Sequence, residues 1–138
     1  MGPVNRIKVT LRVFGDEGLD TLEVGRLLGN DAADVASRSH TQPDGTVRTA
    51  NSWRLQVEGE ELDSLVMTIF SKVTADLQIW DELSRKYRLD LFCGLFLSEE
   101  NQGVELPPQV LRAVAERGLS IGFDIYAGNA ESTPRSEN

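Results

Sequence analysis

The sequence predicts an α+β fold in two layers: a four-stranded, mostly antiparallel or mixed sheet with three to four helices on one face. Two observations support this prediction. Four stretches alternate apolar and polar residues, as half-buried strands do, and in all four the apolar residues stand at odd-numbered positions. Apolar residues at helical spacing lie between these stretches. A parallel sheet covered on both sides would be apolar on both faces, so we expect helices to cover only the odd-numbered face.

The four strands are expected at residues 7–14, 53–58, 88–97 and 119–128. Their apolar side is rich in Val, Ile and Leu, which favour half-buried strands. The fourth strand also carries Gly122 and Asp124, where a fully buried strand would carry larger apolar residues. This composition is a further indication that the even-numbered face lacks a covering layer.

The first helix is expected between two capping signals. Asp20 with Glu23 three residues later resembles a capping box, in which a side chain accepts hydrogen bonds from the first free N–H groups of the helix. Gly29 and Asn30 end the same helix, because both residue types tolerate the left-handed conformation of a C-cap.

A longer helical region and a final helix follow. An apolar stripe runs from 62 to 87, and residues 73–75 are expected to divide it into two helices, with Thr74 as the second N-cap. Pro107-Pro108 opens the last helix, where a missing N–H is tolerated, and Gly118 ends it.

Two segments lack regular patterning. Residues 31–52 form a long polar loop that contains the turn sequence Pro43-Asp44-Gly45, and such a loop is either functional, mobile or folded over the open sheet face. Residues 128–138 are polar and are expected to form a flexible tail. The chain is therefore interpreted as a single domain, 1–138, with an ordered core at about 6–127.

Composition and charge narrow the function classes. The formal net charge of −8 is opposite in sign to the field that a general nucleic-acid-binding surface needs, so we expect no nucleic-acid partner. No apolar run approaches the roughly 18 residues of a membrane span, and the first residues lack a signal-peptide pattern. The single cysteine excludes an internal disulfide. These features favour a cytoplasmic protein without a membrane partner.

The even-numbered face carries the candidate binding site. Several aromatic residues and charges share this face, and Gly94 and Gly122 leave it hollowed. Aromatic and polar groups around a depression are typical of binding surfaces, and an exposed apolar patch indicates a ligand, a partner or a second copy. The candidate residues are Arg12, Phe14, Arg54, Phe92, Phe96, Asp124 and Tyr126.

Catalytic and metal-ligating sets are absent from the pattern. His40 is the only histidine and stands in the polar loop, and Cys93 falls on the apolar face of its strand, where a thiol is buried rather than reactive. One His and one Cys do not make a zinc site. Asp90 and Asp124 would pair only if their strands are neighbours, and salt bridges to the arginines are favoured over acid–base work. We therefore expect no catalytic residue, no metal and no cofactor. These observations together favour a protein that is not an enzyme.

Several motifs together resemble a known family. The motifs V-F-G-D at 13–16, L-L-G at 27–29, S-W-R-L at 52–55, L-P-P-Q-V-L at 106–111 and G-L-S-I-G-F-D-I-Y at 118–126 are similar to the bacterial domain-of-unknown-function family numbered 4279. The resemblance covers about residues 6–126. It implies a small bacterial domain with helices and strands, and it implies no catalytic residue.

Two functions from different classes remain open. The first is a non-catalytic binding module that uses the open sheet face and the 31–52 segment to recognise a basic protein partner or a second copy of itself. The second is a binding protein or enzyme for a small anionic ligand, held by Arg12 and Arg54, stacked on Phe92 or Tyr126, with Asp124 as the acid–base group. A single-stranded RNA platform is disfavoured by the charge.

Overall fold

The structure, a computed structural model, describes residues 6–16, 18–31, 34–97 and 103–126. This part of the chain forms five strands and four helices. In chain order they are β1 (Arg6–Asp16), α1 (Thr21–Leu28), β2 (Asp34–Thr41), β3 (Val47–Gly59), α2 (Leu62–Ser71), α3 (Leu77–Lys86), β4 (Arg88–Phe96), α4 (Pro108–Glu116) and β5 (Ser120–Tyr126).

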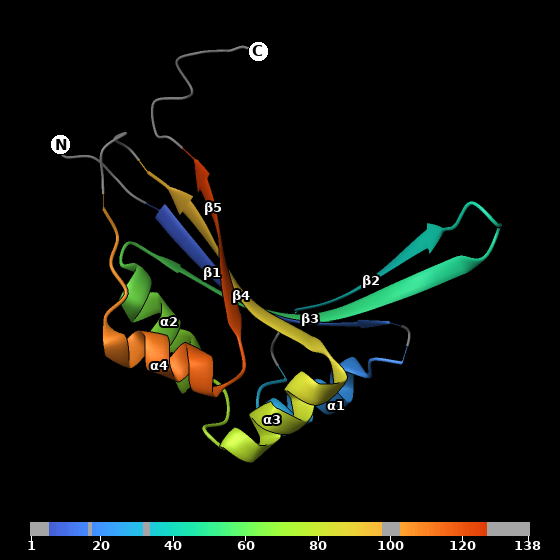
Figure 1. Cartoon of the computed structure of the whole chain (residues 1–138), viewed down its shortest axis with the longest axis horizontal. Coiled ribbons are helices and arrows are strands. Elements are labelled where there is room, and N and C mark those ends of the chain that lie inside the picture. Colours follow the sequence, from blue (N-terminus) through green and yellow to red (C-terminus); the bar gives the residue numbers. More distant parts are fainter. Residues whose placement is uncertain (1–5, 17, 32–33, 98–102, 127–138) are drawn as a thin grey trace, which may run out of the picture.

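The strands form one mixed sheet in the order β2-β3-β1-β4-β5. All neighbouring strands are antiparallel except β4 and β5, which are parallel and are connected through α4. All four helices lie on the same side of the sheet, as Figure 1 shows. The predicted two-layer α+β fold with helices on one face is therefore confirmed, with one strand more than expected.

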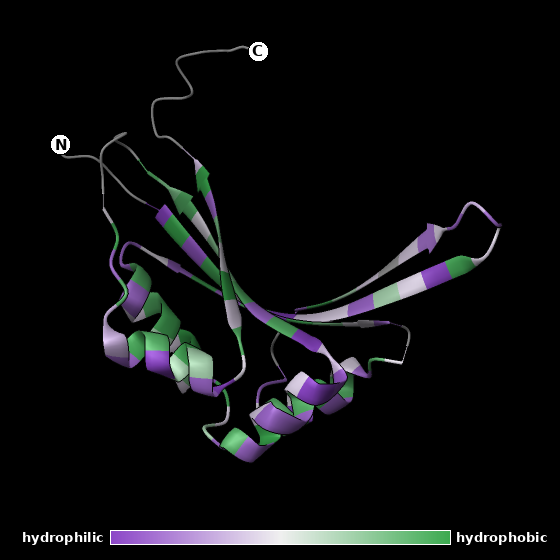
Figure 2. Cartoon of the chain, in the orientation of Figure 1, coloured by the Kyte–Doolittle hydropathy of each residue, from purple (hydrophilic) through white to green (hydrophobic). Residues whose placement is uncertain are grey.

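The odd-numbered strand residues form the core. Val9, Leu11 and Val13 of the central strand β1 are fully buried, and Leu91 and Cys93 of β4 are equally inaccessible. Figure 2 shows the resulting alternation of hydrophobic and hydrophilic residues along β1 and β4. Because side chains alternate between the faces with a period of two, every even-numbered residue of these strands is placed on the side without helices.

The two tryptophans anchor the helices beneath the sheet. Trp53 of β3 and Trp80 of α3 are among the largest fully buried side chains. The indole N–H of Trp80 donates to the carbonyl of Thr74 over 2.9 Å, so the buried ring keeps its polar group satisfied. The Trp80 ring also meets Phe70 of α2 edge to face, with 6.5 Å between the ring centroids.

The caps of the helices follow the sequence signals with one exception. The carboxylate of Asp20 accepts hydrogen bonds from the backbone N–H groups of Leu22 and Glu23, and Gly29 ends α1 with a φ of 76°. The division of the longer region is also confirmed, but the N-cap of α3 is Asp76 and not Thr74. Thr74 lies two residues earlier, where its hydroxyl accepts from the N–H of Asp76 over 3.2 Å.

The prediction of a loop over residues 31–52 is wrong for most of the segment. Residues 34–41 form β2, and β3 begins at Val47 rather than at Trp53. In the turn between them the backbone N–H of Gln42 donates to the carbonyl of Thr46, the N–H of Gly45 donates to the carbonyl of Gln42, and Gly45 has the φ of 91° that this turn requires. The strand was missed because DVASRSHT lacks an apolar alternation, and β2 forms through pairing with β3.

This hairpin extends the sheet sideways and does not fold over it. In Figure 1 the β2–β3 arm projects away from the four helices. The face of the sheet opposite the helices therefore remains open within the described residues. The predicted tail at 128–138 lies outside the described residues, as does residue 127 at the end of the predicted core.

None of the helices in the described ranges combines the length and the apolar character that crossing a membrane requires.

Removal of a core side chain tests this packing. Leu91→Ala is expected to lower the free energy of unfolding by about 2–5 kcal/mol, because Leu91 is fully buried at the centre of β4 and its truncation leaves a cavity. Chemical denaturation measures the effect. The control Leu22→Ala, at a leucine of α1 that is 82% exposed, should stay within about 0.5 kcal/mol of the unchanged protein. Equal losses in the two variants would contradict the assignment of the core.

Candidate functional site

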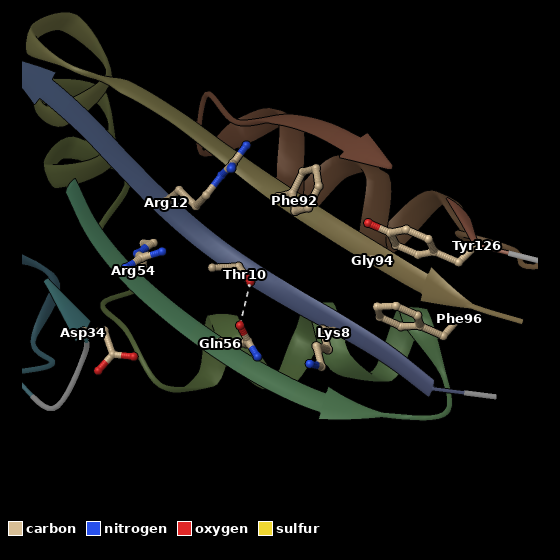
Figure 3. Close-up of a pocket in the computed structure, with 10 residues that line it drawn as sticks. All are labelled: Lys8, Thr10, Arg12, Asp34, Arg54, Gln56, Phe92, Gly94, Phe96 and Tyr126. Atoms are coloured by element: carbon tan, nitrogen blue, oxygen red, sulfur yellow. Dashed lines mark hydrogen bonds between the residues drawn. The ribbon is translucent and has the colours of Figure 1, made fainter. Parts of the chain in front are cut away.

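The seven candidate residues all lie on the open face of the sheet. Five of them line one hollow of about 340 Å³, which Figure 3 shows from the open side. The lining of this hollow consists of Lys8, Thr10, Arg12, Asp34, Arg54, Gln56, Phe92, Gly94, Phe96 and Tyr126. Phe14 lies beside it in an adjoining depression that also contains Arg12 and Arg54. Asp124 reaches the site through a hydrogen bond to Tyr126.

Arg12 is fixed in place at the centre of this face. Its Nε donates to Asp90 Oδ1 over 2.8 Å, and its Nη2 donates to Asp90 Oδ2 over 2.7 Å. This is the bidentate geometry of a strong ion pair. The guanidinium lies 4.5 Å from the ring centroid of Phe92 and 4.8 Å from that of Phe14. Contacts with two rings and one carboxylate restrain the orientation of Arg12.

Arg54 stands directly opposite Arg12 in the β1–β3 register. Like charges in such a pair repel each other. Asp90 neutralises Arg12, whereas the exposed Arg54 forms no ion pair or hydrogen bond with the other described residues. Asp34 is the register partner of Arg54 on β2, but their charged atoms do not come within ion-pair distance. The guanidinium of Arg54 is therefore not neutralised, and it lies beside the guanidinium of Arg12, which Asp90 holds in place.

The opposite end of the hollow is aromatic. The rings of Phe96 and Tyr126 are stacked, with 4.6 Å between the centroids and 5° between the planes. The Lys8 ammonium lies 5.8 Å from the Phe96 centroid. The Tyr126 hydroxyl donates to Asp124 Oδ2 over 2.5 Å, and this hydrogen bond, together with the negative charge of Asp124, raises the pKa of Tyr126.

The floor between the two ends is low and polar. Gly94 has no side chain to fill the space between Lys8 and Asp124, which are its register neighbours on β1 and β5. Thr10 and Gln56 join across β1 and β3 through a hydrogen bond of 3.3 Å. The hollow thus has a cationic end, an aromatic end and hydrogen-bonding groups between them.

Charge is distributed unevenly between the two sides of the protein. Of the chain's 14 cationic and 22 acidic residues, six cations and five acids whose side chains are described lie on the open face. The cations are Arg6, Lys8, Arg12, Arg48, Arg54 and Arg88, and the acids are Asp16, Asp34, Glu58, Asp90 and Asp124. The net charge of −8 therefore comes from the rest of the chain, and the open face is not an acidic surface.

Four residues that line the hollow were not among the candidates predicted from the sequence. Lys8, Thr10 and Gln56 have the same even-numbered parity as the predicted residues, and this signal would have included them. Asp34 was missed because its strand was interpreted as a loop. Asp90 stood in the sequence as a possible partner of an arginine, and the β1–β4 register shows that the arginine is Arg12.

The remaining chemical candidates are separated in the structure. Asp90 and Asp124 lie on neighbouring strands, but the parallel register places Asp90 opposite Ser120 and Asp124 opposite Gly94, so they do not form a pair. Cys93 is buried, and burial raises the pKa of its thiol to about 12. His40 is exposed on β2. In the part of the chain that the structure describes, three or more metal-ligating side chains do not cluster.

A protein-family model with the description "Domain of unknown function (DUF4279)" matches residues 5–128. No curated protein and no solved structure matches the chain. The match covers all of the described strands and helices, including the hollow on the open face.

The contribution of the Arg12–Asp90 ion pair to stability can be tested by substitution. Asp90→Asn is expected to lower the free energy of unfolding by about 1–3 kcal/mol, because Arg12 is partly buried and would lose its charged acceptor. The control is Asp81→Asn, which removes an exposed helical ion pair with Arg85 and should change stability by less than about 0.5 kcal/mol. A loss no greater than that of the control would show that Asp90 does not hold Arg12.

The raised pKa of Cys93 predicts an unreactive thiol. At about pH 8 a thiol with a pKa of about 12 is almost entirely protonated, and only the thiolate attacks a disulfide reagent. We expect native protein to react with dithiobis(nitrobenzoate) far more slowly than protein unfolded in guanidinium chloride, as absorbance will measure. Comparable rates in the two states would overturn the buried placement.

Proposed function

The chain belongs to the family Domain of unknown function (DUF4279), and we propose that it is a non-catalytic binding module whose open sheet face holds a small anionic ligand. The observation that carries this proposal is Arg54. An exposed guanidinium stands beside Arg12, which is already anchored, and finds no carboxylate partner among the described residues. A ligand anion would supply the missing negative charge.

The two arginines make a suitable anion clamp. Arg12 uses two of its five N–H donors on Asp90, so three remain for another acceptor. Its orientation is set before the ligand arrives, and a pre-organised donor loses less entropy on binding. Arg54 faces the same hollow and adds a second fork of donors, which matches the planar oxygens of a carboxylate or phosphate.

The size and lining of the hollow favour a small molecule with an apolar portion. Its volume of about 340 Å³ lies within the roughly 300–1,000 Å³ of small-molecule sites. Phe92 and the stacked pair of Phe96 and Tyr126 offer apolar surface toward the end away from Arg54. We infer a ligand whose anionic group lies between the arginines and whose ring or chain extends over Gly94.

Binding without catalysis is the function that these groups support. Asp124 was the candidate acid–base residue, but its carboxylate is engaged by Tyr126 at the aromatic end of the hollow. Cys93, the one cysteine, is buried on the helix side. The unneutralised cation also favours an anionic ligand on this face over a basic protein partner.

A thermal-shift screen tests the proposal. Phenyl phosphate, benzoate and inorganic phosphate serve as probes, with benzamidine as the cationic counterpart. A ligand that binds only the native state stabilises it by about 2.7 kcal/mol at 100 times its Kd, so an aromatic anion should raise Tm by several degrees. Benzamidine should have no effect.

Two variants locate the binding site. Arg54→Ala is expected to weaken binding of the best probe by about 10–100-fold, the equivalent of one charged hydrogen-bonding contact, and Arg54→Lys should retain part of the affinity. Arg112→Ala removes an exposed cation from α4 and serves as the charge-matched control. Equal affinities in Arg54→Ala and Arg112→Ala, or no stabilisation by any anion, would sink the proposal.

A further inference from the structure

Strand β5 forms one edge of the sheet and has a free side. Within the described residues it pairs only with β4. The backbone N–H of Leu97 donates to the carbonyl of Tyr126 over 3.0 Å, so Tyr126 directs its backbone toward β4. In a parallel ladder alternate residues direct both backbone groups to the same neighbour. The odd-numbered residues Ile121, Phe123 and Ile125 therefore direct theirs toward the free side.

This edge lacks the features that usually prevent strand pairing. Natural edge strands carry lysines, prolines or bulges, whereas β5 reads SIGFDIY. Its one charged residue, Asp124, accepts the hydrogen bond of Tyr126. Phe123 and Ile125 are 44% and 62% exposed on the helix side of the sheet. The opposite edge, β2, has the polar sequence DVASRSHT and offers no such apolar pair.

We propose that β5 pairs antiparallel with β5 of a second copy of the chain, around a two-fold axis at Phe123. This axis pairs all seven residues of the strand, Ser120 with the partner's Tyr126 and so on inward. The free backbone groups of Phe123 then face those of the partner's Phe123, and those of Ile121 face the partner's Ile125. Such an isologous arrangement satisfies the edge of both copies at once.

The side chains are complementary in the same register. Ile121, Phe123 and Ile125 meet the same three residues of the partner in reverse order and form one apolar ladder on the helix side. Asp124 stands opposite the partner's Gly122, so the two aspartates do not repel each other. Moving the axis by one residue toward Tyr126 would place Asp124 opposite the partner's Asp124, which is unfavourable.

The proposed dimer is a continuous ten-stranded sheet. A two-fold axis perpendicular to the sheet keeps the helices of both copies on one side and both open faces on the other. The two hollows therefore face the same direction, and Tyr126 of each copy lies on the strand that forms the contact between the two copies. This assembly does not depend on any ligand, and its test is independent of anion binding.

The mass in solution is the first test. Light scattering on the full chain should give twice the monomer mass of 15.3 kDa. Ile125→Lys places a charge in the apolar ladder and is expected to weaken the dimer at least tenfold, without harm to the fold because Ile125 is exposed in the single chain. Leu22→Lys, at an exposed leucine of α1, is the control and should remain dimeric. A monomer at every concentration, or an Ile125→Lys dimer of unchanged strength, overturns the proposal.

Cysteine cross-linking tests the register. The two copies of residue 123 would be a directly opposed pair with about 5.5 Å between Cα atoms, a distance that a disulfide spans. Phe123→Cys should therefore form a linked dimer on oxidation. Ile121→Cys is the matched control, because its two copies would lie about 13 Å apart along the strands. Cross-linking of Ile121→Cys at the same rate as Phe123→Cys, or none in Phe123→Cys, excludes this pairing.

Discussion

The structure depends on the alternation of side chains along β1. This strand lies at the centre of the sheet and pairs antiparallel with both β3 and β4. Val9, Leu11 and Val13 are fully buried against the helices. The even-numbered residues between them must therefore point to the open face. A slip of one residue would move the whole apolar set to the solvent side, so the core determines the register. The positions of Arg12 and the other open-face residues follow from that same constraint.

Arg12 connects this constraint to the binding chemistry. The register that buries its neighbours also places it opposite Asp90 on one side and Arg54 on the other. Asp90 can satisfy one guanidinium, and the ion pair with Arg12 is bidentate. The resulting asymmetry, with one satisfied cation and one free of described partners, leaves an unneutralised positive charge on the open face although the chain as a whole is acidic. The local arrangement of charge is therefore more informative than the net charge.

Elements that depend on neighbouring residues in the sequence could be predicted, and features that depend on contacts between distant segments could not. Period-two patterning predicted β1, β4 and β5 nearly to their ends. The alternation of apolar and polar neighbours around Leu91 and Val13 is a local signal, and it indicates which face of the strand is buried. The strand β2 was missed, because its residues form a strand only against β3. The pairing of Asp90 with Arg12 required knowledge of which strands are neighbours, as did the separation of Asp90 from Asp124. The N-cap at Asp76, rather than Thr74, was a local choice between two similar signals.

The β2–β3 arm has a consequence for local unfolding. Beyond Ala50, where the pairing with β1 ends, only β2 and β3 continue toward the turn at Gly45 and extend away from the helical layer, and Val47 is largely exposed. A two-stranded ribbon without an apolar layer beneath it has little to hold it against fraying. We expect the amide protons of this arm to exchange with solvent through local unfolding, whereas those of β1 and β4 exchange only when the whole domain unfolds. The chain thus contains a stable core sheet and a two-stranded arm that opens separately, and the two meet at Ala50.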